Sequence, residues 1–136
     1  MSTSMYEPGT ISIRSTADIV LVRQTVRACT VKLGLKLVDQ TKIVTAASEL
    51  ARNTLEHGGG GSLHLETLEE GTRRGLRLTF IDQGPGIANV ELALQDGYTT
   101  GHGMGMGLGG ARRLASEFEI DSKPGKGTRV SITKWK

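Results

Sequence analysis

Glycine is the feature that most constrains this chain, because 19 of its 136 residues are glycine, about twice the usual proportion. The glycines are unevenly spread: four form the run 58–61, and six lie within residues 101–110. Glycine is unfavourable inside helices and strands, so each cluster marks a place where regular structure stops. Because the second cluster leads into an apolar helical pattern, a binding loop explains it better than a flexible linker does.

Length and composition predict a single domain over residues 1–136. A chain of this length can bury a hydrophobic core without disulfides or metal clusters. Cys29 is the one cysteine in the sequence, which excludes an internal disulfide and a cysteine metal cluster. It falls on the apolar side of a predicted helix, and we therefore expect it to be a small core residue.

The charge and hydropathy patterns argue against nucleic-acid and membrane partners. The net charge is +3 without a basic block, and only 4% of the residues are aromatic, so stacking on nucleic-acid bases is not indicated. No apolar run reaches the roughly 18 residues of a membrane span, and the N-terminal segment has no signal-peptide core. We expect a cytoplasmic protein, for which an anionic small ligand and an acidic partner suit the charge balance equally well.

Hydrophobic periodicity predicts elements in the order β, α, α, β, β, loop, α, β, β. Apolar residues recur at spacings of three and four from Ile19 to Leu33, which predicts a helix that Gly34 ends. The other predicted elements are strands over 10–14, 63–66, 76–81, 118–122 and 128–133, helices over 39–56 and 108–117, a short helix near 90–94, and turns over 69–74 and 123–126. This order favours an α+β fold, a two-layer α/β sandwich, and not a doubly wound sheet.

The second long helix carries the first group of residues that could take part in chemistry. Glu49 and Asn53 are four residues apart and so share a helix face, with Glu56 and His57 one turn further on. An amide oxygen suits Mg²⁺, and a carboxylate beside it could orient or deprotonate a nucleophile. Taken alone, however, this pattern is more often an ordinary solvated helix face.

A second group follows the apolar strand that ends at Ile81. Asp82 comes at the strand end and is followed by Gly84, Pro85 and Gly86. A carboxylate in this place can accept a hydrogen bond from an exocyclic amine, and the glycines let a flat ligand approach the backbone closely. The same residue types also form plain turns, which is the commoner explanation for this segment by itself.

The third group is the glycine-rich segment 101–110, which leads into the helix predicted over 108–117. Backbone amides that carry no side chains, placed at a helix N-terminus, can cradle phosphate. Residues 105–110 nearly match a dinucleotide-binding fingerprint, but no strand directly precedes them. Residues 124–128 share glycines and a lysine with a P-loop but lack its spacing and its following helix, so a hairpin turn explains them better.

The order and spacing of these groups resemble the N, G1, G2 and G3 boxes of the GHKL ATPase superfamily. The matching motifs are Glu49…Asn53, Asp82-x-Gly84-x-Gly86, Gly103-x-Gly105-x-Gly107 and Gly127-Thr128, and the resemblance covers residues 44–130. Within the superfamily, segments 48–53, 82–87, 96–100 and 132–135 are similar to the RsbT-type switch kinases of stressosomes. They fit these kinases better than the related anti-sigma kinases.

The resemblance implies a Bergerat-type fold, a mixed and mostly antiparallel sheet covered on one face by helices, that binds ATP and Mg²⁺. It implies that Glu49 is the base for an incoming serine hydroxyl, and that Asn53 holds Mg²⁺ against the phosphates. Asp82 would bind the adenine amino group, and Thr128 would support the base from the opposite side. The remaining nucleotide-binding residues that it implies are Gly84, Gly86, Gly103, Gly105, Gly107, Leu108 and Gly109, the last five at the end of an ATP lid.

The function implied by the resemblance is that of a serine-protein kinase whose substrate is a STAS-domain protein and which can then bind a downstream phosphatase or other output protein. The alternatives are an anti-sigma factor kinase that sequesters a sigma factor, and a nucleotide-dependent adaptor with little kinase activity. Glu49 favours the kinase, because a pure switch needs no base there. A histidine kinase fragment fits less well, since no dimerisation helix with an accepting histidine precedes the ATP-binding part. Arg52, His57 and His102 receive no role.

Overall fold

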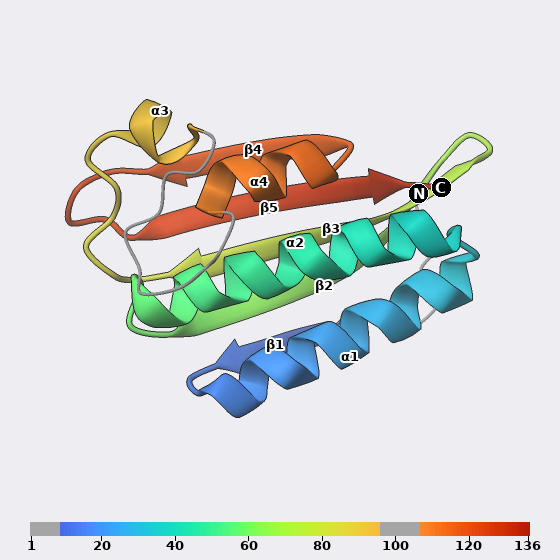
Figure 1. Cartoon of the computed structure of the whole chain (residues 1–136), viewed down its shortest axis with the longest axis horizontal. Coiled ribbons are helices and arrows are strands. Elements are labelled where there is room, and N and C mark those ends of the chain that lie inside the picture. The colour runs from blue at the N-terminus through green and yellow to red at the C-terminus, as the bar shows by residue number, and fades with distance from the viewer. Residues whose placement is uncertain (1–8, 96–106) are drawn as a thin grey trace.

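The computed structural model describes residues 9–95 and 107–136 of the chain, and these build one sheet with helices against it (Figure 1). The strands are β1 (Gly9–Ile13), β2 (Gly61–Glu70), β3 (Arg73–Asp82), β4 (Glu117–Ser122) and β5 (Thr128–Trp135). They are arranged in the order β1-β2-β3-β5-β4, and each of these neighbouring pairs is antiparallel. The sheet is therefore antiparallel in these pairings, where a mixed sheet was expected.

The helices are α1 (Thr16–Leu33), α2 (Leu37–Glu56), α3 (Val90–Ala93) and α4 (Gly107–Leu114). Figure 1 shows α1, α2 and α4 lying over the same face of the sheet, with the short α3 near the start of α4. This arrangement confirms the predicted two-layer α+β sandwich. Among the described residues, no helix combines the length and the apolar character that crossing a bilayer requires.

Local sequence signals explain where α1 begins and ends. The Asp18 carboxylate accepts hydrogen bonds from the backbone N–H groups of Arg14 and Ser15, at 2.8 and 3.1 Å, which satisfies donors at the start of the helix. Gly34 ends the helix in the left-handed conformation, with φ of 79°, a conformation that glycine adopts at little cost. The face predicted from the spacing of apolar residues is buried, and Cys29 lies within it, as expected.

The hydrophobic core lies between the helices and the covered face of the sheet. Phe80 on β3 and Ile132 on β5 are almost fully buried there, as are Ile43 and Leu50 of α2. Burying an aliphatic or aromatic side chain of this size contributes about 1.5–3 kcal/mol. This contact fixes the rotation of α2 about its own axis, and that rotation decides which polar residues of α2 face the end of β3.

Several boundaries differ from the prediction, and two of these differences have a clear structural reason. Strands β2 and β3 continue to a tight turn after Glu70, where Gly71 has φ of 63°, whereas residues 69–74 were expected to form the turn. The paired residues near this turn are polar because the hairpin end is exposed, so they carry no hydrophobic signal. The helix predicted to end at residue 117 ends at Leu114, because Ser116 N–H bonds to Thr133 O at 2.8 Å and β4 pairs with β5 from Glu117 onward.

Candidate nucleotide-binding site

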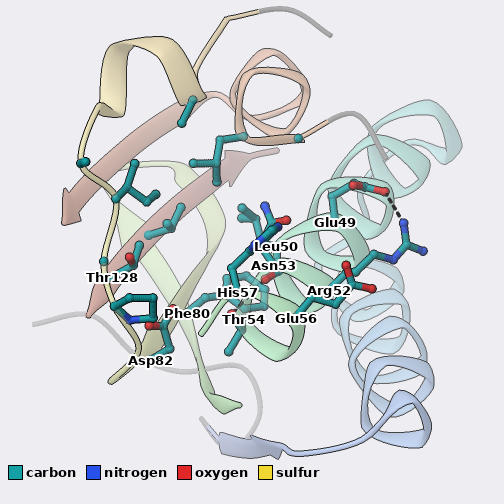
Figure 2. Close-up of a pocket in the computed structure, with 18 of the residues that line it drawn as sticks. Glu49, Leu50, Arg52, Asn53, Thr54, Glu56, His57, Phe80, Asp82 and Thr128 are labelled. Carbon is teal, nitrogen blue, oxygen red and sulfur yellow. Dashed lines mark hydrogen bonds and ion pairs between the residues drawn. The ribbon is translucent and has the colours of Figure 1, made fainter. Parts of the chain in front are cut away.

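A cavity of about 460 Å³ opens beside α2, the ends of β3 and β5, and the segment that leads through α3 to α4 (Figure 2). This volume is within the range of small-molecule sites. Its floor and walls are largely apolar, and polar groups enter from α2 on one side and from the strand ends on the other. The predicted site residues that line it are Glu49, Asn53, Asp82, Gly86, Gly107, Leu108 and Thr128.

The α2 wall carries the group of residues that the sequence placed on one helix face. Glu49 and Asn53 both line the cavity, together with Glu56 and His57. The Arg52 guanidinium donates to Glu49 Oε1 at 3.1 Å, and the two side chains are 35% and 12% exposed. Glu49 is therefore a largely enclosed carboxylate held through one of its oxygens, at the side of the cavity opposite Asp82 and Thr128 (Figure 2).

Asp82 lies at the end of β3, where three glycines make room for it. Its Oδ1 accepts a hydrogen bond from Gly84 N–H at 2.9 Å. A Cβ on Gly58 would lie 2.6 Å from Asp82 Oδ2, and a Cβ on Gly84 would lie 2.7 Å from Gly58 Cα. A Cβ on Gly127 would overlap the Asp82 carbonyl oxygen. The position of the carboxylate therefore depends on the absence of side chains around it.

Gly84 has a structural role beside Asp82. The structure packs it against Gly58, and it does not line the cavity that the described residues form; its contact with nucleotide stays a prediction. Its N–H orients the Asp82 carboxylate. Gly84 therefore acts on the cavity through Asp82.

The loop after Asp82 is docked onto the turn between β4 and β5. Gly86 has φ of 78°, and a Cβ there would overlap the carbonyl oxygen of Lys123. Gly125 N–H donates to Pro85 O at 2.7 Å, and Ile87 N–H donates to Ser122 Oγ at 2.8 Å. These contacts hold the loop as one wall of the cavity.

Sequence reasoning missed Ser122, which lies at the end of β4. Its hydroxyl is 2.7 Å from the Thr128 hydroxyl, and Thr128 is the register partner of Asp82 across β3 and β5. A signal was present: Phe118, Ile120 and Ser122 alternate on the inward side of the strand, so a polar residue replaces an apolar one at the third position. A hydroxyl at such a position needs partners, and here it has them.

The glycine-rich segment is described from Gly107 onward, and Gly103, Gly105, His102 and the motif 96–100 lie outside the described residues. Gly107 and Leu108 begin α4 and line the cavity. Gly109 does not line it: a Cβ there would overlap the carbonyl oxygen of Leu94, just after α3. The absence of a side chain at Gly109 is therefore explained by close packing between α3 and α4.

The comparisons with known proteins agree with this geometry. Residues 38–136 match the family described as histidine kinase-, DNA gyrase B-, and HSP90-like ATPase. The chain belongs to this ATPase family, whose members use ATP, and the GHKL resemblance predicted from the motifs is confirmed.

Within the family, the chain is 39% identical over 131 residues to the serine/threonine-protein kinase RsbT of Bacillus subtilis (strain 168), which covers 96% of this chain and 98% of RsbT. It is 32% identical over 119 residues to an anti-sigma F factor of Thermoanaerobacter sp. (strain X514), with 83% and 82% covered. The likeness to RsbT confirms the prediction of an RsbT-type, ATP-dependent protein kinase.

Among solved structures, the RsbU and RsbW domains of a Mycobacterium tuberculosis protein align with a TM-score of 0.67 and 24% identity. The alignment covers 95% of this chain but 32% of the other. At this identity the match concerns the fold alone, and it agrees with the two-layer sandwich.

Proposed function

We propose that this chain transfers the γ-phosphate of Mg²⁺-ATP to a serine of a STAS-domain protein in a bacterial signalling switch. One observation carries the proposal: a single face of α2 brings Glu49 and Asn53 to the cavity whose other side holds Asp82 and Thr128. A site for the adenine base and a site for the metal ion and the nucleophile thus share one cavity. Membership of the ATPase family and the likeness to RsbT support the same conclusion.

The end of the cavity beside Asp82 and Thr128, called the base end because adenine is proposed to lie there, suits a flat, weakly polar ring. Phe80, Ile87 and Val130 supply apolar surface there, and Asp82 supplies a carboxylate oriented by Gly84. In this proposal the carboxylate accepts a hydrogen bond from the adenine 6-amino group. A hydrogen bond to a charged group is worth about 1.5–3 kcal/mol, which makes Asp82 the main polar determinant of affinity.

The α2 wall fits Mg²⁺ that arrives with the phosphates. No group of three or more His, Cys, Asp or Glu side chains in residues 9–95 and 107–136 could hold a metal ion, so these residues form no all-protein cage. Mg²⁺ does not need one, because it usually keeps several waters and binds through one or two protein oxygens plus phosphate. The Asn53 amide oxygen is the proposed protein ligand, and the bound ion would neutralise phosphate charge.

Glu49 is placed to act on the incoming serine. In the proposed step, the Glu49 carboxylate accepts the hydroxyl proton while the serine oxygen bonds to the γ-phosphorus. The bond from the γ-phosphorus to the β,γ-bridging oxygen breaks, and ADP leaves. Arg52 occupies Oε1, so Oε2 is the oxygen that would take the proton. A positioned general base typically contributes about 10²–10⁴-fold in rate.

The experiment compares transfer and binding in matched variants. The purified chain is incubated with Mg²⁺ and γ-³²P-labelled ATP together with a purified STAS-domain protein, and label on the serine is counted. Glu49→Gln should keep the ATP affinity of the parent and lose about 10²–10⁴-fold in transfer. Glu69→Gln removes an exposed carboxylate at the opposite end of β2 and should change neither.

Two outcomes would contradict the proposal. Transfer by Glu49→Gln at the parental rate would remove Glu49 from the chemistry. No labelling of any STAS-domain protein by the parent would reject the STAS substrate.

The likeness to anti-sigma F factors favours a second candidate, in which the chain acts chiefly by binding a protein and releasing it according to the bound nucleotide. The two candidates are compatible if phosphorylation of the STAS partner frees the chain to bind an output protein such as a phosphatase. Glu49→Gln separates them. If the chain acts chiefly by binding, the variant should still capture its partner in the presence of ATP and work as the parent does. If the chain acts as a kinase, the variant should leave the serine unmodified and fail to switch its partner.

A further inference from the structure

Ser122 occupies a junction of three chain segments at the base end of the cavity. Its Oγ accepts a hydrogen bond from Ile87 N–H at 2.8 Å, lies 2.7 Å from Thr128 Oγ1, and is 3.2 Å from the carbonyl oxygen of Gly127. Ser122 does not itself line the cavity, whereas Ile87 and Thr128 do. Any effect of Ser122 on a ligand therefore passes through its neighbours.

A count of protons decides how the hydroxyls are oriented. Ser122 has one hydroxyl proton, and each hydroxyl oxygen can accept two hydrogen bonds. If Ser122 donates to Gly127 O, Thr128 donates to Ser122, and all three contacts of Ser122 are hydrogen bonds. If Ser122 donates to Thr128 instead, the contact with Gly127 is lost. The first arrangement satisfies more groups in this half-buried site and is the one favoured.

This orientation leaves the Thr128 oxygen able only to accept hydrogen bonds from the cavity. Asp82, its register partner, is also an acceptor. The nearby Thr54 hydroxyl adds no donor, because it donates to Leu50 O at 2.9 Å within α2. The strand-end wall of the cavity therefore offers two adjacent acceptors to a ligand, in addition to its apolar surface.

We propose that Ser122 is a positioning residue for base selectivity: by taking the Thr128 proton, it keeps this wall acceptor-only and favours purines with a 6-amino group over those with a 6-oxo group. The inference rests on the proposed function, because it assumes that the base lies against Asp82 and Thr128. Adenine presents an amino donor directly to the two acceptors. Hypoxanthine presents a carbonyl oxygen, whose lone pairs face the lone pairs of both.

The test measures the dissociation constants of ATP and of inosine triphosphate, each with Mg²⁺, by calorimetry. The dissociation constant of inosine triphosphate divided by that of ATP, called the selectivity ratio below, should be large for the parent. Ser122→Ala frees the Thr128 hydroxyl to donate, so the ratio should fall by about 2- to 10-fold, the range of one hydrogen bond. If Ser122 had a purely structural role, the substitution would weaken the binding of both nucleotides alike and leave the ratio unchanged.

Two further variants isolate the mechanism. In a Thr128→Val background, Ser122→Ala should no longer change the ratio, because the hydroxyl through which Ser122 acts is gone. Ser131→Ala is the matched control: it removes the serine of another Ser–Thr hydroxyl pair, with Thr79 at 3.0 Å on the opposite face of the sheet, and should leave the ratio unchanged. If Ser122→Ala is too unstable to measure, Ser122→Cys, with a weakly accepting thiol, should shift the ratio in the same direction.

The outcomes separate this inference from the proposed function. If Asp82→Asn binds ATP as tightly as the parent, the base is not held at this wall and the proposed site fails. If Asp82→Asn weakens ATP but neither Ser122 variant lowers the ratio, the site stands and the role of Ser122 is rejected. The role of Ser122 would also be rejected if Ser122→Ala lowered the ratio equally in the parent and in the Thr128→Val background.

Discussion

Gly58→Ala is predicted to weaken nucleotide binding although Gly58 does not line the cavity. The φ of Gly58 is not positive, so the backbone accepts alanine without strain. The new Cβ would lie 2.5 Å from Asp82 Cβ and 2.6 Å from Asp82 Oδ2, both well inside van der Waals contact. The Asp82 side chain must therefore move, and it loses the position that Gly84 N–H fixes for it.

The size of the effect follows from what Asp82 contributes. A displaced carboxylate forfeits a charged hydrogen bond to the ligand, about 1.5–3 kcal/mol, which corresponds to roughly 10- to 100-fold in affinity. Overpacking itself costs about 1–3 kcal/mol of stability. That is less than the about 5–15 kcal/mol by which domains are typically stable, so the variant should stay folded with a lowered melting temperature.

The assay is calorimetry of ATP binding in four proteins: parent, Gly58→Ala, Asp82→Asn and Gly9→Ala. Gly9 has open space around its Cβ position and no positive φ, so its alanine variant is the control and should bind like the parent. Combining Gly58→Ala with Asp82→Asn should weaken binding little beyond Asp82→Asn alone, because both act through one carboxylate. Parental affinity in folded Gly58→Ala would refute the argument that the glycines place Asp82.

Three further predictions test the rest of the site. Gly109→Ala should lower stability by about 1–3 kcal/mol in thermal unfolding, because its Cβ overlaps Leu94 O; an unchanged melting temperature would contradict the packing role. Asn53→Ala should weaken Mg²⁺-dependent ATP binding and phosphate transfer together, and equal affinity with and without Mg²⁺ in the parent would exclude Asn53 as a ligand. Arg52→Gln should slow transfer by up to about fivefold at unchanged ATP affinity, the worth of a partly exposed ion pair, and should have no effect once Glu49 is glutamine.

The helices and their faces could be predicted because their signals are local. The spacing of apolar residues and a single glycine define α1, and the same spacing orients α2 so that Glu49 and Asn53 face the cavity. The strand limits were harder to predict. The end of α4 depends on the pairing of Glu117 with Thr133, sixteen residues away, and no local pattern encodes that competition.

The glycines have packing contacts that motif reasoning does not predict. The motif assigns Gly84, Gly86 and Gly109 to nucleotide contact, which stays a prediction. The structure adds a packing contact for each, with Gly58, with Lys123 and with Leu94, and Gly86 also lines the cavity. Such contacts join segments far apart in the chain, so they are invisible until the fold is known. Ser122 was missed for the same reason, because its hydroxyl partners lie on a loop and on the next strand.

These contacts imply that the position of Asp82 is specified as much by its surroundings as by its own identity. Gly58 follows α2, Gly84 follows β3 and Gly127 precedes β5, and a side chain at any of them would displace Asp82 or its immediate neighbours. Gly58 also lies two residues after the end of the helix that carries Glu49 and Asn53. A shift of the end of α2 relative to β3 would therefore move Asn53, the proposed metal ligand, and Glu49, the proposed general base. The same shift would disturb Asp82. The site should accordingly lose nucleotide binding and transfer in concert when this junction is altered, whereas changes at Glu49 alone separate the two.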